Sequence, residues 1–405
     1  MSSLLQSAAV SLLFRYADFV AVLGGTEFHL GWIVGVGMVG SLAMRMVLGS
    51  WIDRYGARPL WIGSILLFTA TCFAHLAIAS HTGAAIYLLR LSYCCAVAGF
   101  GGASMTFVSS RTANDRVAEL VGMLGTGGFI GSVVGTLLGD FLFGSITITF
   151  TQVAWMFIVA GLLGLLSLPF AWAATRNERV SRTVSPLSPG EMPRYVSPLP
   201  KGERPASREP SPLTLVFRYN PGIILAIGVA MGVGLGLPST FLRTYAAELG
   251  IPRIGLFFLV YSIAAIAIRV PTCRWTERFG PRRIILVGMA GMIASIAIFP
   301  LVHAEWQLVL PAIGFGCSHA ILWPAVVAAG SITFPRQHRG LATVLILAAW
   351  DLGLLVASPA AGVILSSSKA FDLPPYPTMF LSIAGLLAIV GLWYALASRN
   401  AETTT

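Results

Sequence analysis

Residues 44–58, MRMVLGSWIDRYGAR, decide the fold, because residues 268–282, IRVPTCRWTERFGPR, repeat their pattern 224 positions later. At this one offset three arginines, an acidic residue and a glycine coincide: Arg45 with Arg269, Asp53 with Glu277, Arg54 with Arg278, Gly56 with Gly280 and Arg58 with Arg282. Chance agreement of this kind is improbable, so the chain contains two related halves. Looser matches join Gly131 to Gly353. Duplicated halves with a binding site between them are typical of membrane transporters.

The composition excludes most soluble classes of protein. Of the 405 residues, 56% are hydrophobic and only 10% are charged, and the mean hydropathy is +0.81. An ordinary soluble domain carries about 25% charged residues. A soluble enzyme, a disordered chain and a nucleic-acid-binding module are therefore excluded. A membrane-spanning helix needs roughly 20 apolar residues, which fits a multi-span protein.

The apolar runs predict an all-α integral membrane protein with twelve transmembrane helices in two pseudo-symmetric six-helix halves. The predicted spans are 2–24, 29–52, 60–80, 83–108, 118–143, 149–174, 220–246, 255–273, 284–302, 308–331, 341–366 and 378–397. By the repeat, the first helix looks shortened at its start, and two explanations stay open: a start site farther upstream, or a first span that is short. We therefore expect a start farther upstream to increase the folded yield. We expect no cleaved signal peptide, because no basic region precedes Leu4.

The polar segment between the spans predicts the domain organisation: an N-terminal half at 1–174, a flexible cytoplasmic linker at 175–213 and a C-terminal half at 214–405. The segment is rich in Pro, Ser, Arg and Glu and cannot bury enough apolar area to fold alone. Within it, SPLSPGE at 185–191 is echoed by SPLPKGE at 197–203. Low-complexity drift and a regulatory binding site both remain open for this repeat.

The placement of basic residues predicts the orientation. If the 53–59 loop lies inside, the inside segments hold 19 of the 26 basic residues, and the outside loops hold only Arg253 and Lys369. Cytoplasmic loops carry such an excess of Lys and Arg. We expect a multi-pass protein of the inner (plasma) membrane with both termini in the cytoplasm. The net charge of +10 then needs no nucleic acid partner.

Metal, cofactor and nucleotide sites are not indicated. The five cysteines lie in or beside apolar runs without CxxC or metal-ligand spacing, so we expect neither a disulfide framework nor a metal. There is no GxxxxGK[ST] phosphate loop and no dinucleotide-binding fold pattern. We expect no cofactor, and any active transport must use an ion gradient.

The loop at 49–58, GSWIDRYGAR, is similar to the signature loop of the major facilitator superfamily, G-x-x-x-D-[RK]-x-G-[RK]-[RK], with Ala57 in place of a basic residue. Its second copy, at 273–283, departs from the pattern at Cys273. In that superfamily the loop latches the two halves together on the cytoplasmic side. The resemblance implies a latch role for these residues: Asp53, Arg54, Arg58, Glu277, Arg278 and Arg282. The alternative is that they are only positive-inside anchors.

The loop glycines have separate expected roles. We expect Gly49 to permit a close helix approach, and Gly56 and its counterpart Gly280 to permit a tight turn.

The fifth span carries Gly122, Gly131, Gly135 and Gly139. Their spacing resembles the superfamily's antiporter motif, G-x8-G-x3-G-P-x2-G-G, although Thr136 and Asp140 replace the proline and the last glycine. The resemblance favours export. Small residues four apart also let helices pack closely in lipid, and this alone explains the glycines.

Ionisable residues inside spans are functional candidates, because they are costly there. Asp351, after Trp350, lies roughly 16 Å into its span at 1.5 Å per residue and is a candidate for proton or substrate handling. The alternative is a structural pair with an arginine. His319, near Trp323, can donate and accept hydrogen bonds, although a buried histidine is more often a core residue.

Five more residues of the spans are candidates. The superfamily often has an arginine at the place of Arg90, which implies a proton-relay role. Arg15 and Arg243, the latter near Tyr245, occupy comparable places in the two halves and would attract an anionic substrate or extend to the outer interface. Asp18 lies one turn beyond Arg15, so a local salt bridge would also explain that pair.

These features predict a secondary active transporter that moves small organic solutes by alternating access, with proton-coupled efflux preferred. The sequence resembles the sugar-efflux and drug-efflux branches in its fifth and eleventh spans. The alternatives are an ion-coupled importer of small organic anions such as monocarboxylates, and a non-transporting membrane sensor on the same fold. No nucleophile–base pair or paired carboxylates indicate an enzyme. We expect a monomer whose partners are the substrate, protons and the bilayer.

Overall fold

The structure is a computed structural model, and it describes residues 1–111, 117–143, 148–176, 219, 222–272, 275–334 and 339–403. All regular elements in this part of the chain are helical. The long helices are α3 (Glu27–Tyr55), α4 (Ala57–Ala74), α5 (Ala84–Arg111), α6 (Val117–Leu142), α7 (Phe150–Thr175), α9 (Ile223–Glu248), α10 (Gly255–Thr272), α12 (Pro281–Ile298), α13 (Val309–Ile332), α14 (Arg339–Ala370) and α15 (Pro375–Thr403). The shorter ones are α1 (Ser2–Leu12), η1 (Leu13–Arg15), α2 (Tyr16–Val22), η2 (His75–Ala77), α11 (Trp275–Phe279), η3 (Phe299–Leu301) and η4 (Glu305–Leu308).

The twelve predicted helices are confirmed. In the described residues, eleven helices are long and apolar enough to cross a membrane, and the first of them combines α1, η1 and α2 into Ser2–Val22. The twelfth predicted span is α10, whose apolar part, Gly255–Arg269, is shorter. The ends of α6 and α7 lie within one residue of the predicted spans.

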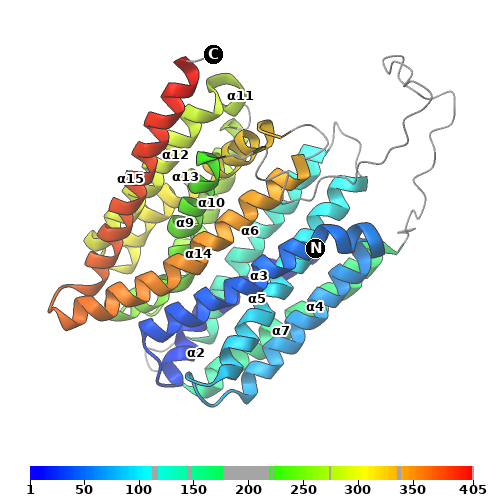
Figure 1. Cartoon of the computed structure of the whole chain (residues 1–405). Coiled ribbons are helices and arrows are strands. Elements are labelled where there is room, and N and C mark those ends of the chain that lie inside the picture. Colours follow the sequence, from blue (N-terminus) through cyan, green and yellow to red (C-terminus); the bar gives the residue numbers. More distant parts are fainter. Residues whose placement is uncertain are drawn as a thin grey trace.

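The helices form two bundles that lie side by side (Figure 1). Helices α1 to α7 pack mainly with one another, as do α9 to α15, and α3 packs along α14 while α6 packs against α10 across the interface. We call the end that carries Arg54, Arg278 and Arg399 the basic end, and the end of Gly24 and Gly250 the opposite end. The domain boundaries at 174 and 214 stay a prediction, because the linker beyond Arg176 lies outside the described residues.

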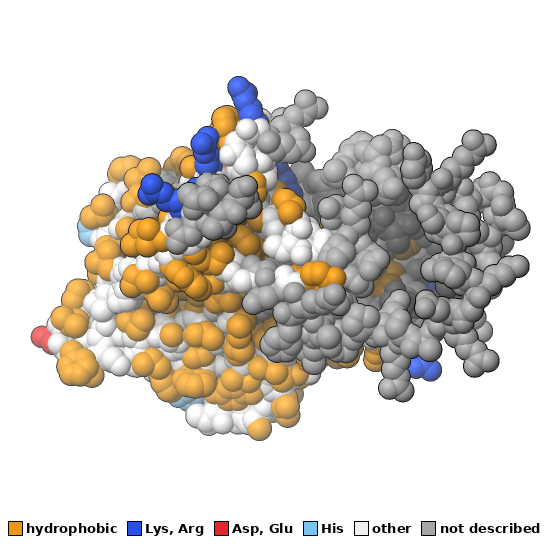
Figure 2. All heavy atoms as spheres, turned by 45° about the horizontal axis from the view of Figure 1, so that its top comes forward, with side chains coloured by type: hydrophobic (Ala, Val, Ile, Leu, Met, Phe, Trp, Pro, Cys, Tyr) orange, Lys and Arg blue, Asp and Glu red, His pale blue; other side chains and the backbone are white. Residues whose placement is uncertain are grey.

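The bundle's exterior is apolar. Large side chains such as Met46, Phe141 and Ile389 are 82%, 82% and 68% exposed. Hydrophobic side chains cover the visible flank in Figure 2, and several Lys and Arg side chains project from the rim above it. A surface of this kind suits contact with lipid.

Two glycines form the expected tight turns of the repeated loop. Gly56 (φ 82°) and Gly280 (φ 78°) have positive φ, which L-residues with a side chain rarely adopt. Gly56 separates α3 from α4, and Gly280 separates α11 from α12. The expected close approach at Gly49 is wrong for this conformation, because a Cβ there would meet nothing within 4 Å. The open space is confined to the Gly49 face, because the adjacent Leu48 packs against Gly102 of α5.

The glycines of α6 bring it against α1. A Cβ on Gly131 would collide with the backbone of Leu4, and one on Gly135 with the carbonyl of Ala8. Gly139 lies against the side chain of Arg15. The side-chain environment of Gly122 lies outside the described residues. The α6 glycines thus allow backbone contact between the first and fifth spans.

Replacing Gly135 with alanine should therefore destabilise the protein. The added methyl group meets backbone of α1, which cannot move aside like a side chain, and overpacking of this kind costs about 1–3 kcal/mol. We expect a melting temperature lower by several degrees in detergent. Gly127→Ala on the same helix is the matched control, because a Cβ there meets nothing within 4 Å. Equal melting temperatures for the two variants would contradict this packing.

Candidate functional site

A cavity of about 600 Å³ lies between the two bundles. It is lined by α1, α5 and α6 on one side and by α9, α10, α13 and α14 on the other. Its lining extends to Ser3 and Met105 near the basic end, where Met105 is 39% exposed. The volume is in the range of pockets that hold small organic ligands.

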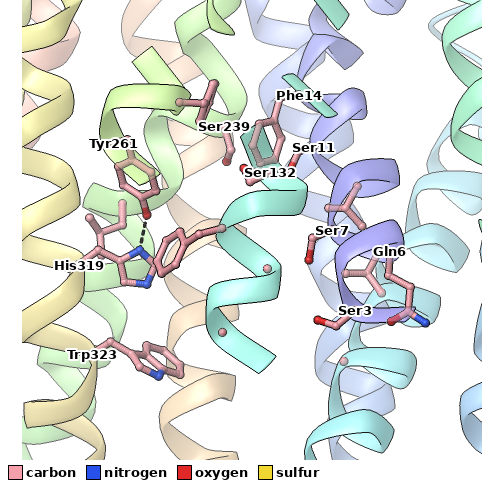
Figure 3. A pocket seen from close by; sticks show the side chains of 18 of the residues that line it. Ser3, Gln6, Ser7, Ser11, Phe14, Ser132, Ser239, Tyr261, His319 and Trp323 are labelled. Carbon is pink, nitrogen blue, oxygen red and sulfur yellow. Dashed lines mark hydrogen bonds between the residues drawn. The ribbon is translucent and has the colours of Figure 1, made fainter. Parts of the chain in front are cut away.

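The wall from the first bundle carries a polar strip on α1. Its α1 residues lie together in Figure 3: Ser3, Gln6, Ser7 and Ser11. Ser11 donates a hydrogen bond to Ser132 of α6 (3.0 Å), and Gln6 Nε2 donates to Ser2 (3.0 Å). This wall offers hydroxyl and amide groups to a ligand.

The wall from the second bundle is aromatic. Tyr261 of α10 is hydrogen-bonded to His319 of α13, and Figure 3 shows both residues and Trp323 on the side of the cavity away from α1. The rings of Trp323 and Trp350 meet edge to face with centroids 5.7 Å apart, and His319 lies 6.0 Å from Trp350. Such rings provide a stacking surface for a planar ligand.

Only some sequence candidates reach this cavity. His319, Trp323 and Trp350 line it, whereas the remaining candidates within the spans do not: Arg15, Asp18, Arg90, Arg243, Tyr245 and Asp351. Sequence analysis missed Tyr261 and the serines. A serine that faces a cavity has the same sequence signal as one that packs between helices.

Four buried charged side chains form a network of ion pairs at the opposite end of the molecule. Arg15 pairs with Asp18 (3.1 Å) and with Asp140 of α6 (2.7 Å), and Arg243 of α9 pairs with Asp18 (2.9 Å). The side chains are 2–10% exposed. We call these four residues the opposite-end cluster. Its two cations and two anions balance, which buried charges require.

Backbone groups extend the opposite-end cluster to α10. Arg15 donates to the carbonyl of Pro252 (2.8 Å), and Asp140 accepts from the N–H groups of Ile254 (3.1 Å) and Gly255 (2.6 Å). The cluster therefore joins the first and fifth spans to the seventh and eighth. Sequence analysis noticed Asp140 only as a departure from the antiporter motif.

The expectation that Arg15 and Arg243 attract an anionic substrate is not supported by this arrangement. The two side chains are 2% and 3% exposed, and their carboxylate partners are already present. The alternative of a local Arg15–Asp18 salt bridge is what the structure contains.

A second ion pair crosses the interface between the bundles. Arg45 of α3 donates through Nε to Asp351 Oδ2 of α14 (2.5 Å) and through Nη2 to Oδ1 (3.3 Å), and Ser41 donates to the same carboxylate (2.6 Å). Asp351 is 4% exposed. The arginine partner considered in the sequence analysis is thus Arg45.

Arg90 and Tyr245 occupy other surroundings. The Arg90 guanidinium lies over the rings of Tyr16 (4.4 Å) and Tyr93 (4.8 Å), and its Nε has no hydrogen-bond partner. Tyr245 is buried and donates through its hydroxyl to the carbonyl of Phe299 (2.5 Å). Tyr245 therefore packs within the second bundle and does not face the cavity.

The repeated loop residues lie at the basic end. Arg58 stacks on Trp172 of α7 (3.9 Å), and Arg282 donates to Ser398 (2.8 Å) and to the carbonyl of Ala395 (3.1 Å) of α15. These contacts stay within one bundle. The guanidiniums of Arg54 and Arg278 lie over the rings of the residues that follow them. The side chains of Asp53 and Glu277 lie outside the described residues.

A cavity between two related helical bundles, with charged contacts across their interface, defines a membrane transporter of the alternating-access class. The family model of the Major Facilitator Superfamily matches residues 1–253 and 224–404. The chain belongs to this superfamily, whose members are transporters that bind small molecules within the membrane and are not enzymes.

Curated relatives are distant but match over nearly their whole length. The chain is 23% identical to "Multidrug resistance protein MdtH" of Yersinia pestis (strain Pestoides F) over 403 residues, covering 95% of this chain and 90% of the relative. The protein of the same name from Yersinia pseudotuberculosis serotype O:1b (strain IP 31758) gives the same values.

Solved structures share the fold. The nucleoside transporter NupG matches with a TM-score of 0.74 and 14% identity, covering 98% of this chain and 96% of that one. A bacterial homolog of the human lysosomal transporter Spinster, inward-facing and unoccupied, matches with a TM-score of 0.70 and 16% identity, covering 98% and 95%.

Proposed function

We propose that this chain exports small organic solutes by proton-coupled alternating access. The observation that carries the proposal is the asymmetry of the cavity. Its opposite end is closed by the opposite-end cluster, whereas its lining continues toward the basic end. A binding site between two halves that is closed at one end only is what one state of such a cycle requires.

The orientation follows the positive-inside rule. We place the basic end and both termini in the cytoplasm of a cell with the chain in its inner membrane, so the conformation is inward-facing. Residues 1–174 and 214–405 are the two moving halves, 175–213 is their linker, and the working unit is a monomer. In the outward-facing state the repeated loop residues latch the basic end.

Coupling to protons is assigned to Asp351. When α3 and α14 separate, this carboxylate loses its ion pair with Arg45 and is left without a counter-ion. Protonation and movement of the halves are then linked. The antiporter-like glycines of α6 and the multidrug resistance relatives support export as the direction.

The importer alternative depended on Arg15, Arg243 and Arg90 facing the substrate. None of the three lines the cavity. Export is therefore preferred.

The test compares metabolites inside and outside cells that express the wild type or a variant with Asp53→Ala and Gly56→Asp, at equal membrane levels. We expect at least one organic solute to be depleted inside only with the wild type. The variant should fail to export, because it loses the loop carboxylate and places a side chain at a positive φ. A solute accumulated by the wild type would indicate import. No difference across a broad panel would favour a sensor.

A further inference from the structure

The internal repeat pairs the two helix crossings that join the bundles, α3 with α14 and α10 with α6. Arg45 of α3 corresponds to Arg269 of α10. Gly353 of α14 corresponds to Gly131 of α6, and each of these glycines packs against the first helix of its own half, α9 for Gly353 and α1 for Gly131. A Cβ on Gly131 would collide with the backbone of α1, and one on Gly353 with the backbone of α9, the first helices of their halves.

The equivalence is broken at the charged positions. Two residues before each glycine, α14 carries Asp351 and α6 carries Phe129. Ser41, which also donates to Asp351, corresponds to Ala265. At one crossing the arginine binds a carboxylate and a hydroxyl contacts the same carboxylate, whereas at the other crossing the corresponding two positions carry a phenyl ring and a methyl group.

Arg269 therefore lacks the partner that the repeat gives to Arg45. It lines the cavity, and among the described residues it forms neither an ion pair nor a hydrogen bond. A Cβ on Gly125 of α6 would lie 3.2 Å from its Nη1. Gly125 is one helical turn from Phe129, so the guanidinium lies close to the position where the counter-ion is missing.

The rest of the described lining contains no aspartate or glutamate. A cation at membrane depth without a counter-ion is costly, and cavities that carry one mark sites for substrates or ions. The ring centroid of Phe129 lies 6.1 Å from that of Tyr261 and 5.7 Å from that of His319. Phe129, which occupies the position of the absent carboxylate, is therefore continuous with the aromatic wall.

We propose that the substrate supplies the missing anion, and that the cavity takes aromatic organic anions. The carboxylate or sulfonate of such a compound pairs with Arg269, its ring stacks on the wall of Phe129, His319 and Trp350, and its polar substituents meet the α1 serines. The proposal rests on the proposed function and names its substrate class. Organic cations are disfavoured, because nothing in the described lining neutralises them.

The test is calorimetric titration of the purified full-length protein with three probes of one shape: 2-naphthoate, 2-naphthamide and 2-naphthylmethylammonium. Charge-assisted hydrogen bonds contribute enough free energy to change affinity about tenfold to hundredfold. We expect 2-naphthoate to bind at least about tenfold more tightly than the amide, and the ammonium compound to bind most weakly. Equal affinities, or preference for the cation, would overturn the proposal.

Two variants locate the anion site. Arg269→Gln removes the cation, and Phe129→Asp installs the carboxylate that the repeat would place beside it. Arg269→Gln should weaken 2-naphthoate binding about tenfold or more and leave 2-naphthamide binding within about threefold. Phe129→Asp also removes a stacking ring and weakens both probes, so its readout is loss of the preference for the carboxylate over the amide. Arg399→Gln removes an exposed arginine, and Phe129→Leu removes the ring without adding charge, so both should keep the preference for the carboxylate.

The outcomes separate this inference from the proposed function. If folded Arg269→Gln and Phe129→Asp proteins, each eluting as the wild type does, bind 2-naphthoate as tightly as wild type, the anion site is refuted. The anion site is also refuted if the wild type binds none of the probes. Neither result bears on the proposed export function, which the metabolite comparison tests separately. Selective binding of 2-naphthoate without any solute redistribution in cells would support the anion site and refute the proposed export function.

Discussion

Replacing Asp18 with asparagine should open the opposite end of the protein. Asp18 is the carboxylate that Arg15 of the first bundle and Arg243 of the second share, at 3.1 and 2.9 Å. Removing one partner from a buried charge group costs about 3–5 kcal/mol. Because asparagine keeps an amide oxygen, we expect the lower figure. The equilibrium between the closed and the open opposite end should then shift roughly hundredfold toward the open form.

The measurement is thiol labelling of a Ser239→Cys probe in a background without other cysteines. Ser239 lines the cavity one helical turn before Arg243, so it lies just beneath the opposite-end cluster. A membrane-impermeant maleimide added outside should label the probe slowly in the Asp18-containing protein. With Asp18→Asn we expect labelling to be at least about tenfold faster.

The matched control is Asp372→Asn. Asp372 is an exposed aspartate at the same end of the molecule, and its positive φ of 55° suits asparagine. This variant should label at the original rate. If Asp18→Asn folds in normal yield and also labels at the original rate, the opposite-end cluster is not a gate.

The sequence predicted the fold because its signals are local. Each span is a run of apolar residues, and the turn at Gly56 is encoded by one residue with a positive φ. The Arg15–Asp18 pair was also accessible, since residues three apart on a helix are neighbours. For these features the information lies within one or two helical turns.

The contacts between the bundles could not be predicted from one sequence. Arg45 and Asp351 are 306 positions apart, and nothing in either span selects the other. Asp351 was recognised as costly, and an arginine was considered as its partner, but five arginines lie within spans. Choosing among them requires knowing which helices cross and at what level.

Gly49 shows a different limit. The motif predicts where two helices come close, but a transporter has more than one conformation, and in this one Gly49 faces open space. The same limit affects Arg269. The repeat identifies the position of Arg269 in the sequence. That Arg269 has no carboxylate partner follows only from the packing of α6 against α10.

Replacing Asp351 with asparagine should uncouple transport from protons. The change leaves the Arg45 guanidinium at the interface without its carboxylate and removes the group that would bind a proton when α3 and α14 separate. Loss of a buried partner of this kind costs about 3–5 kcal/mol, so we expect the export rate to fall about tenfold or more. The solute identified by the metabolite comparison is followed in cells with and without a protonophore. Wild-type export should collapse with the protonophore, and the residual export by Asp351→Asn should not respond to it.

A second ion pair between the same two helices supplies the control. Lys369 of α14 and Glu27 of α3 pair at 3.1 Å, but their side chains are 50% and 23% exposed. Exposed pairs contribute about 0–1 kcal/mol, so Glu27→Gln should keep both the export rate and its response to the protonophore.

The exchanged variant, Arg45→Asp with Asp351→Arg, should recover the melting temperature that Asp351→Asn loses, because it restores a pair across the interface. It should remain poor in export, since the carboxylate then sits on α3. Full protonophore-sensitive export by Asp351→Asn would show that this carboxylate only holds the halves together and that the coupling proton binds elsewhere.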